Sequence, residues 1–267
     1  MNYPRMNSNQ FDLSNKRALI TGGTQGIGAS IAQGLAKAGA SIIINARDEA
    51  KLEKCLIEFQ QQQIDAKGSL FDITNTSAVK RAIEDIESNI GPIDILVNNG
   101  GVIRRSPAEN LEESDWDDVI RTNLTGPFLL SKYVGRNMIK RKRGKIINIC
   151  SLMSELGRDT VAAYAASKGG LKMLTRNLAT EWAKYNIQVN GIGPGYIATP
   201  INTSYREIGN PLNDYIISRT PAGRWGTPED LIGTAVFLAS DASDFVNGQV
   251  IYVDGGLLTT FGNPIMI

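Results

Sequence analysis

Short runs of β-branched residues alternate with longer amphipathic stretches along most of the chain, and this alternation constrains the fold more than any other feature. It predicts an α/β, doubly wound fold, with a parallel sheet covered by helices on both faces. The segments SIIIN and KIINI are apolar throughout, as strands buried on two faces must be. The expected strands of a seven-stranded parallel sheet are 17–21, 41–45, 68–72, 93–98, 145–149, 188–192 and 250–253. The expected helices include 27–38, 52–62, 77–90 and 164–185.

The chain is expected to form one domain over residues 1–267, because that length can bury one sizeable core and no linker or repeat interrupts the pattern. Residues 1–10 form a polar N-terminal tail. Residues 200–228 contain several prolines and glycines without a clean period, so this stretch is predicted to be an insertion on the substrate side. Loops of that length often act as lids.

Composition excludes several classes of protein. The chain has 28 Lys and Arg against 27 Asp and Glu, so the near-neutral charge argues against a nucleic-acid partner. It contains no histidine, which excludes Ser-His-Asp and Cys-His mechanisms and His-ligated zinc. Cys55 and Cys150 lie far apart in apolar segments, so no metal site is expected. The sequence shows no signal peptide and no membrane span, so we expect a cytoplasmic protein without a membrane partner.

The first expected strand runs directly into TGGTQGIG and then into a helix. Glycines in such a turn let the backbone approach a pyrophosphate, and the helix N-terminus offers free N–H groups to its charge. Asp72, at the end of the third expected strand, is a candidate acceptor for the adenine amino group. Asn99 and Gly100 follow the fourth strand, where an open parallel sheet collects ligands.

The second expected strand ends in Asn45, Ala46 and Arg47. In a dinucleotide fold, a carboxylate at this point binds the ribose 2′-hydroxyl and repels a 2′-phosphate. Ala46 removes that repulsion, and Arg47 supplies a cation able to pair with a phosphate. NADP(H) is therefore favoured as the cofactor, with NAD(H) as the alternative.

Tyr164 and Lys168 stand four residues apart in YAASK, so a helix places them on one face. A free phenol ionises only near pH ~10, but a nearby ammonium favours the phenolate and makes the phenol usable in proton transfer. Ser151 follows the fifth expected strand, where the sheet could bring its hydroxyl beside the Tyr164 ring.

With TGGTQGIG, NNGG, Asn123, Ser151, YAASK and PGYIAT in this order over residues 12–258, the sequence resembles the short-chain dehydrogenases/reductases. The resemblance implies a Rossmann sheet and hydride transfer between a nicotinamide and a carbonyl or alcohol carbon. It implies that Tyr164 is the acid/base, that Ser151 binds the substrate oxygen and that Asn123 positions a relay water. Lys168 would favour phenolate formation and hold the nicotinamide ribose. One departure is Gly100, where the family motif NNAG has alanine.

The expected cofactor contacts, from the motifs and from this resemblance together, are Gly22, Thr24, Gln25, Gly26, Ile27, Gly28, Arg47, Asp72, Ile73, Asn99, Gly100, Tyr164, Lys168, Pro194, Gly195, Ile197 and Thr199. The expected substrate contacts are Arg104, Ser151, Glu155, Arg158, Tyr164 and Tyr196.

The substrate is expected to be a small sugar acid. Arg104, Arg105 and Arg158 suit a carboxylate, and Glu155 suits sugar hydroxyls as an acceptor. The segment around them lacks the apolar lining that a fatty-acyl or steroid substrate requires. A divalent cation bridging Glu155 and the substrate carboxylate is a weaker hypothesis. Tyr196 and Trp225 are expected to close over the substrate from the insertion.

Three longer segments, INICSLMSELGRDTVAAYAASKGGLKMLT, NIQVNGIGPGYIAT and TPAGRWG, resemble one group within the family, the gluconate 5-dehydrogenases. The resemblance implies oxidation of gluconate at C5 and a homotetramer, with the apolar end LLTTFGNPIMI available to cover a neighbouring subunit. Three alternatives stay open. The first is oxidation of 2-dehydro-3-deoxy-gluconate at C5, and the second is another short-chain reductase of hydroxy or keto acids. The third is a non-catalytic NADP(H)-binding sensor.

Overall fold

A computed structural model describes residues 10–260 of the chain. Its centre is a seven-stranded sheet in the order β3-β2-β1-β4-β5-β6-β7, with every neighbouring pair parallel. The strands are β1 Arg17–Thr21, β2 Ser41–Ala46, β3 Ala66–Leu70, β4 Ile95–Asn98, β5 Gly144–Ile149, β6 Ile187–Pro194 and β7 Val250–Val253. The predicted doubly wound parallel sheet is confirmed.

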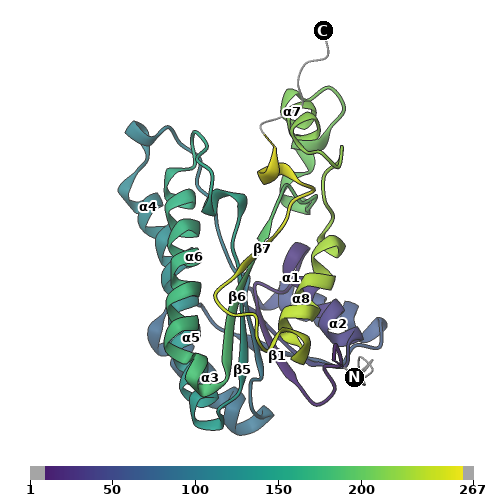
Figure 1. The fold of residues 1–267 in the computed structure, drawn as a ribbon, viewed down its shortest axis with the longest axis vertical. Coiled ribbons are helices and arrows are strands. Elements are labelled where there is room, and N and C mark those ends of the chain that lie inside the picture. Colours follow the sequence, from purple (N-terminus) through teal and green to yellow (C-terminus); the bar gives the residue numbers. More distant parts are fainter. Residues whose placement is uncertain (1–9, 261–267) are drawn as a thin grey trace, which may run out of the picture.

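Helices cover both faces of this sheet (Figure 1). The α-helices are α1 Gly26–Lys37, α2 Glu49–Gln61, α3 Thr76–Asp85, α4 Glu113–Ile120, α5 Gly126–Arg141, α6 Ala162–Trp182, α7 Pro211–Arg219 and α8 Ile232–Ala239. Helices α1, α2 and α8 lie on one face, and α3, α5 and α6 lie on the other (Figure 1). None of the helices within residues 10–260 is long and apolar enough to span a membrane.

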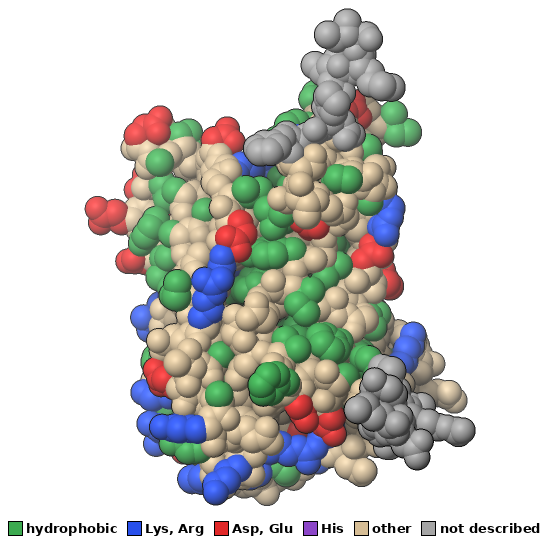
Figure 2. Space-filling model, in the orientation of Figure 1, with side chains coloured by type: hydrophobic (Ala, Val, Ile, Leu, Met, Phe, Trp, Pro, Cys, Tyr) green, Lys and Arg blue, Asp and Glu red, His purple; other side chains and the backbone are tan. Residues whose placement is uncertain are grey.

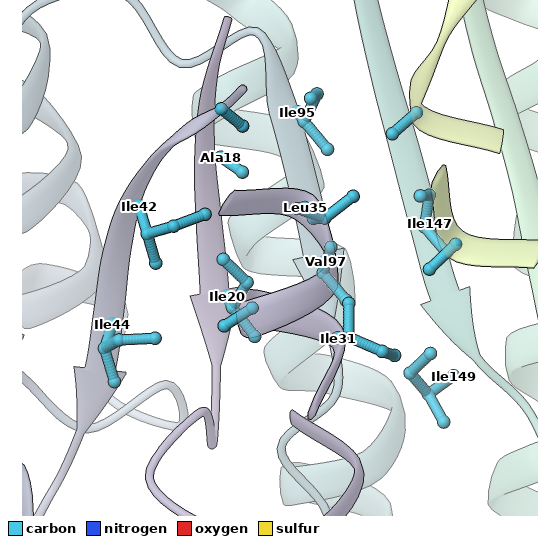
Figure 3. Close-up of a cluster of buried hydrophobic side chains, with 14 of the residues drawn as sticks. Ala18, Ile20, Ile31, Leu35, Ile42, Ile44, Ile95, Val97, Ile147 and Ile149 are labelled. Atoms are coloured by element: carbon cyan, nitrogen blue, oxygen red, sulfur yellow. The ribbon is translucent and has the colours of Figure 1, made fainter. Parts of the chain in front are cut away.

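Each face of the sheet has its own hydrophobic cluster, since alternate side chains of a strand point to opposite sides. In the first cluster, Ile31 and Leu35 of α1 pack onto Ile20, Ile44 and other strand residues that are almost wholly buried (Figure 3). The second cluster joins Leu19 and Ile43 of the same strands to buried side chains of α3, α5 and α6. Both clusters rest on the uninterrupted apolar strands that the sequence predicted.

Buried amides join β4, β5, α5 and α6. Asn98 donates to Asn148 Oδ1 at 2.8 Å and to Ser131 Oγ at 3.2 Å. Asn148 in turn donates to Thr175 Oγ1 at 2.8 Å, and that hydroxyl donates to the Leu171 carbonyl at 2.8 Å. Because an unpaired buried amide is costly, these bonds fix α6 against the two central strands.

Most expected strands and helices begin or end a few residues away from the observed bounds, and two differences stand out. The third strand was expected at 68–72 but ends at Leu70, because Asp72 folds its carboxylate onto the Thr74 N–H and hydroxyl, both at 2.8 Å. The stretch 200–228 was expected without regular structure but contains α7 and a 3₁₀-helix at Pro200–Arg206. Asn210 begins α7 by accepting the Leu212 N–H at 3.0 Å, ahead of a proline at the first turn.

Strand β7 forms one edge of the sheet and stays partly accessible along its length. Hydrophobic side chains gather around it on the face drawn in Figure 2, with most of the charged side chains of both signs nearer the rim. The predicted polar tail 1–10 and the apolar end 257–267 lie outside the described residues, except for residue 10 and residues 257–260. The expected homotetramer therefore stays a prediction.

We expect Thr175→Val to destabilise the protein, because it leaves the Asn148 amide without its buried acceptor. The loss in free energy of unfolding should be about 1–3 kcal/mol, which lowers Tm by about 2–4 °C per kcal/mol. Thr180→Val is the matched control, because its hydroxyl bonds the Arg176 carbonyl on the same helix but is exposed. Both variants are compared by thermal unfolding. Equal losses in Tm would contradict the stabilising role given to the buried Thr175 hydroxyl.

Candidate active site

A cavity of about 660 Å³ opens where β1, β4, β5 and β6 end, which is where open parallel sheets hold ligands. Its wall includes Tyr164 and Lys168, which lie on α6. It also brings together these predicted residues: Gly22, Thr24, Gln25, Gly26, Ile27, Asn99, Gly100, Arg104, Ser151, Arg158, Pro194, Gly195, Tyr196, Ile197 and Thr199. Segments far apart in the sequence thus meet at one site.

The turn after β1 has the shape of an anion cradle. Gly22 and Gly26 have positive φ angles of 59° and 56°, which favour glycine, and a Cβ on Gly22 would lie 2.9 Å from Gly100 Cα. Helix α1 begins at Gly26, and the side chain of its N-cap, Gln25, makes no capping bond. The first backbone N–H groups are therefore available to an anion. This cradle fits the pyrophosphate of a dinucleotide.

The segment after β4 is bonded directly to this turn. Asn99 Nδ2 donates to the carbonyls of Thr21 and Gly22 at 3.0 and 2.9 Å, and Thr21 Oγ1 accepts the N–H groups of Asn99 and Gly100 at 3.1 Å each. A Cβ on Gly100 would meet Ile73 Cδ1 at 3.1 Å. Glycine at this position therefore leaves intact the hydrogen bonds between side chain and backbone that join the two loops.

Lys168 and Tyr164 lie side by side, as their helical spacing predicted. The Lys168 ammonium lies 5.7 Å from the centre of the Tyr164 ring and donates to the Ile149 carbonyl at 2.6 Å. Lys168 is only 4% exposed, so this carbonyl at the end of β5 holds a nearly dry cation beside the phenol. The arrangement suits a phenol that exchanges a proton with a bound ligand.

Ser151 lies in the same wall, directly after β5. Its Oγ accepts the Met153 N–H at 3.1 Å, so its own proton is available to a ligand oxygen. The Ser154 hydroxyl ties this turn to α6 by donating to the Lys168 carbonyl at 3.0 Å. Ser151 and Lys168 are therefore positioned as one unit.

Asn123 is fully buried and does not line the cavity. Its side chain accepts the Val102 N–H at 2.8 Å, donates to the Val102 carbonyl at 2.8 Å, and donates to Ser167 Oγ at 3.2 Å. These bonds join the segment after β4 to α6. The role in a water relay stays a prediction, and the side chain shown here acts as a structural link.

The cavity wall is positively charged. Three arginines and Lys168 line it, and no acidic side chain of the described residues does. Arg104 is paired with Asp118 at 2.7 Å and with Asp115 at 3.4 Å, so two carboxylates already balance its charge. The cavity is consequently suited to anions, but Arg104 is less free to bind one than expected.

The other two arginines have neutral partners. The Arg105 guanidinium lies over the Tyr205 ring at 5.8 Å from its centre, and Arg158 donates to the Tyr196 hydroxyl at 3.4 Å. Neither contact balances their charge. Arg158 is half-buried in the cavity wall, which makes it the better-placed candidate for a ligand carboxylate.

Glu155 does not face the cavity, contrary to expectation. Its carboxylate accepts from Tyr252 OH at 2.6 Å and from the Lys172 ammonium. The Lys172 hydrogen bond, followed by that of Tyr252, holds the pKa of Glu155 below its usual range. These partners turn the side chain away from the site. Within residues 10–260, no Cys, Asp and Glu side chains form a metal-binding group, so the cation hypothesis finds no support here.

Four predicted cofactor contacts also lie outside the cavity wall. Gly28 packs inside the turn, where a Cβ would meet the Gly22 carbonyl at 2.5 Å. Ile73 is buried close to Gly100, Arg47 is exposed beyond the end of β2, and the Asp72 carboxylate is bonded to Thr74. A long dinucleotide could reach past the cavity to Arg47 and Asp72, so their roles stay predictions.

The wall also contains residues that the sequence analysis missed. Ile103, Leu152, Met153 and Val161 are apolar, so the expectation that this region lacks apolar lining is wrong. Asn202 adds a polar group from the 200–228 stretch. Trp225 is absent from the wall, because its ring packs edge-on against Tyr196 with the ring centres 5.7 Å apart. No periodic pattern in SLMSEL singled out Met153.

Neither thiol should react in the folded protein at pH 8. Burial raises the pKa of both Cys55 and Cys150 to about 11, so the reactive thiolate is scarce as well as inaccessible. We expect iodoacetamide to label neither cysteine of the native chain and both after denaturation, as counted by mass spectrometry. Rapid labelling of native Cys150 would contradict the closed packing around β5.

Comparisons with known proteins identify a family for this chain. Residues 16–208 match the family model described as short chain dehydrogenase. The 2-dehydro-3-deoxy-D-gluconate 5-dehydrogenase of Formosa agariphila is 54% identical over 97% of this chain and 98% of its own length. The 5-keto-D-gluconate 5-reductase of Escherichia coli K12 is 51% identical over 93% of this chain and 97% of its own length.

A solved structure is similarly close. The gluconate 5-dehydrogenase from Burkholderia cenocepacia, in complex with NADP and tartrate, is 48% identical with a TM-score of 0.91. The match covers 94% of this chain and 98% of the other. With a family model covering more than half of the chain and these relatives along nearly all of it, the chain belongs to the short chain dehydrogenase family.

Proposed function

We propose that this enzyme interconverts D-gluconate and 5-dehydro-D-gluconate with NADP(H). The observation that carries the proposal is a cavity in which Tyr164, Lys168 and Ser151 lie together with three arginines and no acidic side chain of the described residues. Such a wall favours a ligand with phosphate and carboxylate charges and offers a proton-transfer group for an alcohol. The names of the 51% and 48% identical relatives support the same reaction.

The choice of NADP(H) as cofactor is based on the glycine turn and on Arg47. The cradle at Gly22 and Gly26 would hold the pyrophosphate, and Arg47 would pair with the 2′-phosphate of NADP(H). No carboxylate stands at Ala46 to oppose that phosphate. When bound, the nicotinamide supplies a hydride acceptor or donor. The NADP in the Burkholderia cenocepacia structure supports this choice.

The chain's own residues handle the proton. In the oxidation, Tyr164 takes the proton of the C5 hydroxyl as the C5 hydrogen leaves as hydride, and in the reduction it returns the proton to the oxygen. Lys168 stabilises the phenolate through its ammonium, which the Ile149 carbonyl holds in place. Ser151 donates a hydrogen bond to the reacting oxygen.

The carboxylate of the acid would bind Arg158, the cavity arginine that donates only to a neutral hydroxyl in the contacts described above. A guanidinium can bind a carboxylate through two parallel N–H groups, which also fixes the direction of the carbon chain. This would leave C5, at the far end of a six-carbon acid, near Tyr164. Arg104, balanced by two aspartates, contributes less charge.

A second candidate is the oxidation of 2-dehydro-3-deoxy-D-gluconate at C5. The 54% identical relative from Formosa agariphila bears the name of that activity. Both acids combine a carboxylate at one end with an alcohol at C5, so the same residues serve either one. They differ at C2 and C3, which the apolar side chains of Met153 and Val161 could distinguish.

A nicotinamide absorbance assay tests the function directly. D-gluconate, 5-dehydro-D-gluconate and 2-dehydro-3-deoxy-D-gluconate are each offered with NADP(H) and with NAD(H), and kcat/KM is compared. We expect the highest value for gluconate or its 5-dehydro form with NADP(H). Binding of NADPH without turnover of any acid would contradict the proposal. The expected homotetramer and cytoplasmic location are separate predictions.

Tyr164→Phe should lower kcat by about 10²- to 10⁴-fold, because it removes the proton-transfer group and keeps the ring. NADPH affinity, measured by fluorescence titration, should change little. Tyr185→Phe is the matched control, since Tyr185 lies outside the cavity, in the 3₁₀-helix Ala183–Tyr185 that follows α6. A Tyr164→Phe enzyme with the wild-type rate would end the acid/base assignment.

Arg47→Ala should weaken NADPH binding by about 10- to 100-fold and leave NADH binding within about 3-fold, because only NADPH carries the 2′-phosphate. Lys54→Ala is the control, since it removes an exposed cation from α2. Dissociation constants for both cofactors give the comparison. Equal losses for NADH and NADPH would show that Arg47 does not recognise the phosphate.

A further inference from the structure

Helix α7 is connected to the cavity through two aromatic side chains. Figure 1 shows α7 beyond one end of the sheet, within the stretch expected to be a lid. The Trp225 indole N–H donates to Asn213 Oδ1 on this helix at 2.9 Å. The Trp225 ring meets Tyr196 edge to face, and the Tyr196 hydroxyl accepts from Arg158 at 3.4 Å. These contacts form a series from Asn213 through Trp225 and Tyr196 to Arg158. The series thus ends at the arginine proposed above to bind the substrate carboxylate.

Backbone bonds hold the middle of this series. The Gly226 N–H donates to the Tyr196 carbonyl at 2.9 Å, and the Ala198 N–H donates to the Gly226 carbonyl at 2.8 Å. Residues 197 and 226 thus form a parallel bridge that fixes Trp225 beside Tyr196. Arg224 adds a two-point ion pair with Asp230, at 2.7 and 3.0 Å. The two rings therefore have little freedom to move independently.

The same contacts direct Arg158. A guanidinium has five N–H donors, and the bond to Tyr196 uses only one of them. The planar group is thereby oriented while its other donors stay available to a ligand. Its partner is a neutral hydroxyl, so the full positive charge is kept for the cavity. A carboxylate in place of Tyr196 would have neutralised it.

The geometry points to Asn213 and Trp225 as positioning residues that, through Tyr196, set the orientation of Arg158 and so make the enzyme select anionic substrates. The inference rests on the proposed function, because it explains how the proposed enzyme would select a substrate with a carboxylate. It adds residues from α7 and its C-terminal loop that touch neither the cavity nor the reacting atoms. Neutral polyols are discriminated against only while α7 holds the series in place.

The test compares D-gluconate with D-gluconamide, which replaces the carboxylate by a neutral amide. Arg158→Gln should lower kcat/KM for gluconate by about 10- to 100-fold and that for gluconamide by less than about 3-fold. Trp225→Phe keeps a ring but loses the N–H to Asn213, and should raise KM for gluconate by about 3- to 10-fold with kcat unchanged. Asn213→Ala should have the same effect as Trp225→Phe.

Combining the substitutions separates positioning from general damage. If Trp225 acts through Arg158, adding Trp225→Phe to Arg158→Gln should lower kcat/KM for gluconate no further. Trp116→Phe on exposed α4 is the matched control and should match the wild type. Additive losses, or equal losses for gluconate and gluconamide, would overturn the inference, because a merely structural role affects both substrates alike.

Failure of the proposed function would look different, since the wild-type enzyme would then turn over no sugar acid at all. In that case the dissociation constant of tartrate, a dicarboxylate, is measured by calorimetry on the NADP-loaded enzyme. It shows whether Trp225 still affects anion binding through Arg158. Trp225→Phe should weaken tartrate by about 3- to 10-fold in the wild-type background and not in Arg158→Gln. Equal weakening in both backgrounds, or none in either, would overturn the inference by this second route.

Discussion

The buried ammonium of Lys168 is the interaction on which the site depends. A cation that is 4% exposed would be costly without a partner, and the Ile149 carbonyl at the end of β5 supplies one at 2.6 Å. The bond ties the face of α6 that carries Tyr164 to the end of a central strand. The Tyr164 phenol thus lies beside the cavity because the neighbouring Lys168 ammonium must hydrogen-bond to the Ile149 carbonyl.

Further side-chain hydrogen bonds around Lys168 join the strands, α6 and the loops that form the site. The Asn98, Asn148 and Thr175 series holds α6 against β4 and β5 from within the core. Asn123 joins the segment after β4 to α6, and Asn99 joins that segment to the glycine turn. Each link gives the N–H donors of a buried or half-buried amide an acceptor, so displacing one loop would leave donors unpaired in several others. The cavity wall consequently behaves as one connected unit.

Charge is distributed unevenly over that unit. Lys168 and the arginines line the cavity, whereas no acidic side chain of the described residues does. Asp115 and Asp118 pair with Arg104 from outside the wall, and Glu155 pairs with Lys172. This separation makes the wall attractive to anions, and it divides the arginines into one balanced by carboxylates and two that keep their charge. Function depends on these pairings as much as on the identity of the residues.

The sequence by itself determined the parallel sheet, the glycine turn, and the common helical face of Tyr164 and Lys168, because strand and helix periodicity and glycine's backbone freedom are local properties. Only the tertiary structure decided which arginines keep their charge for the cavity, that Glu155 turns to Lys172, and that Trp225 packs against Tyr196. Those outcomes depend on side chains from distant segments competing for the same partners. A local sequence pattern cannot predict which of these distant side chains will pair.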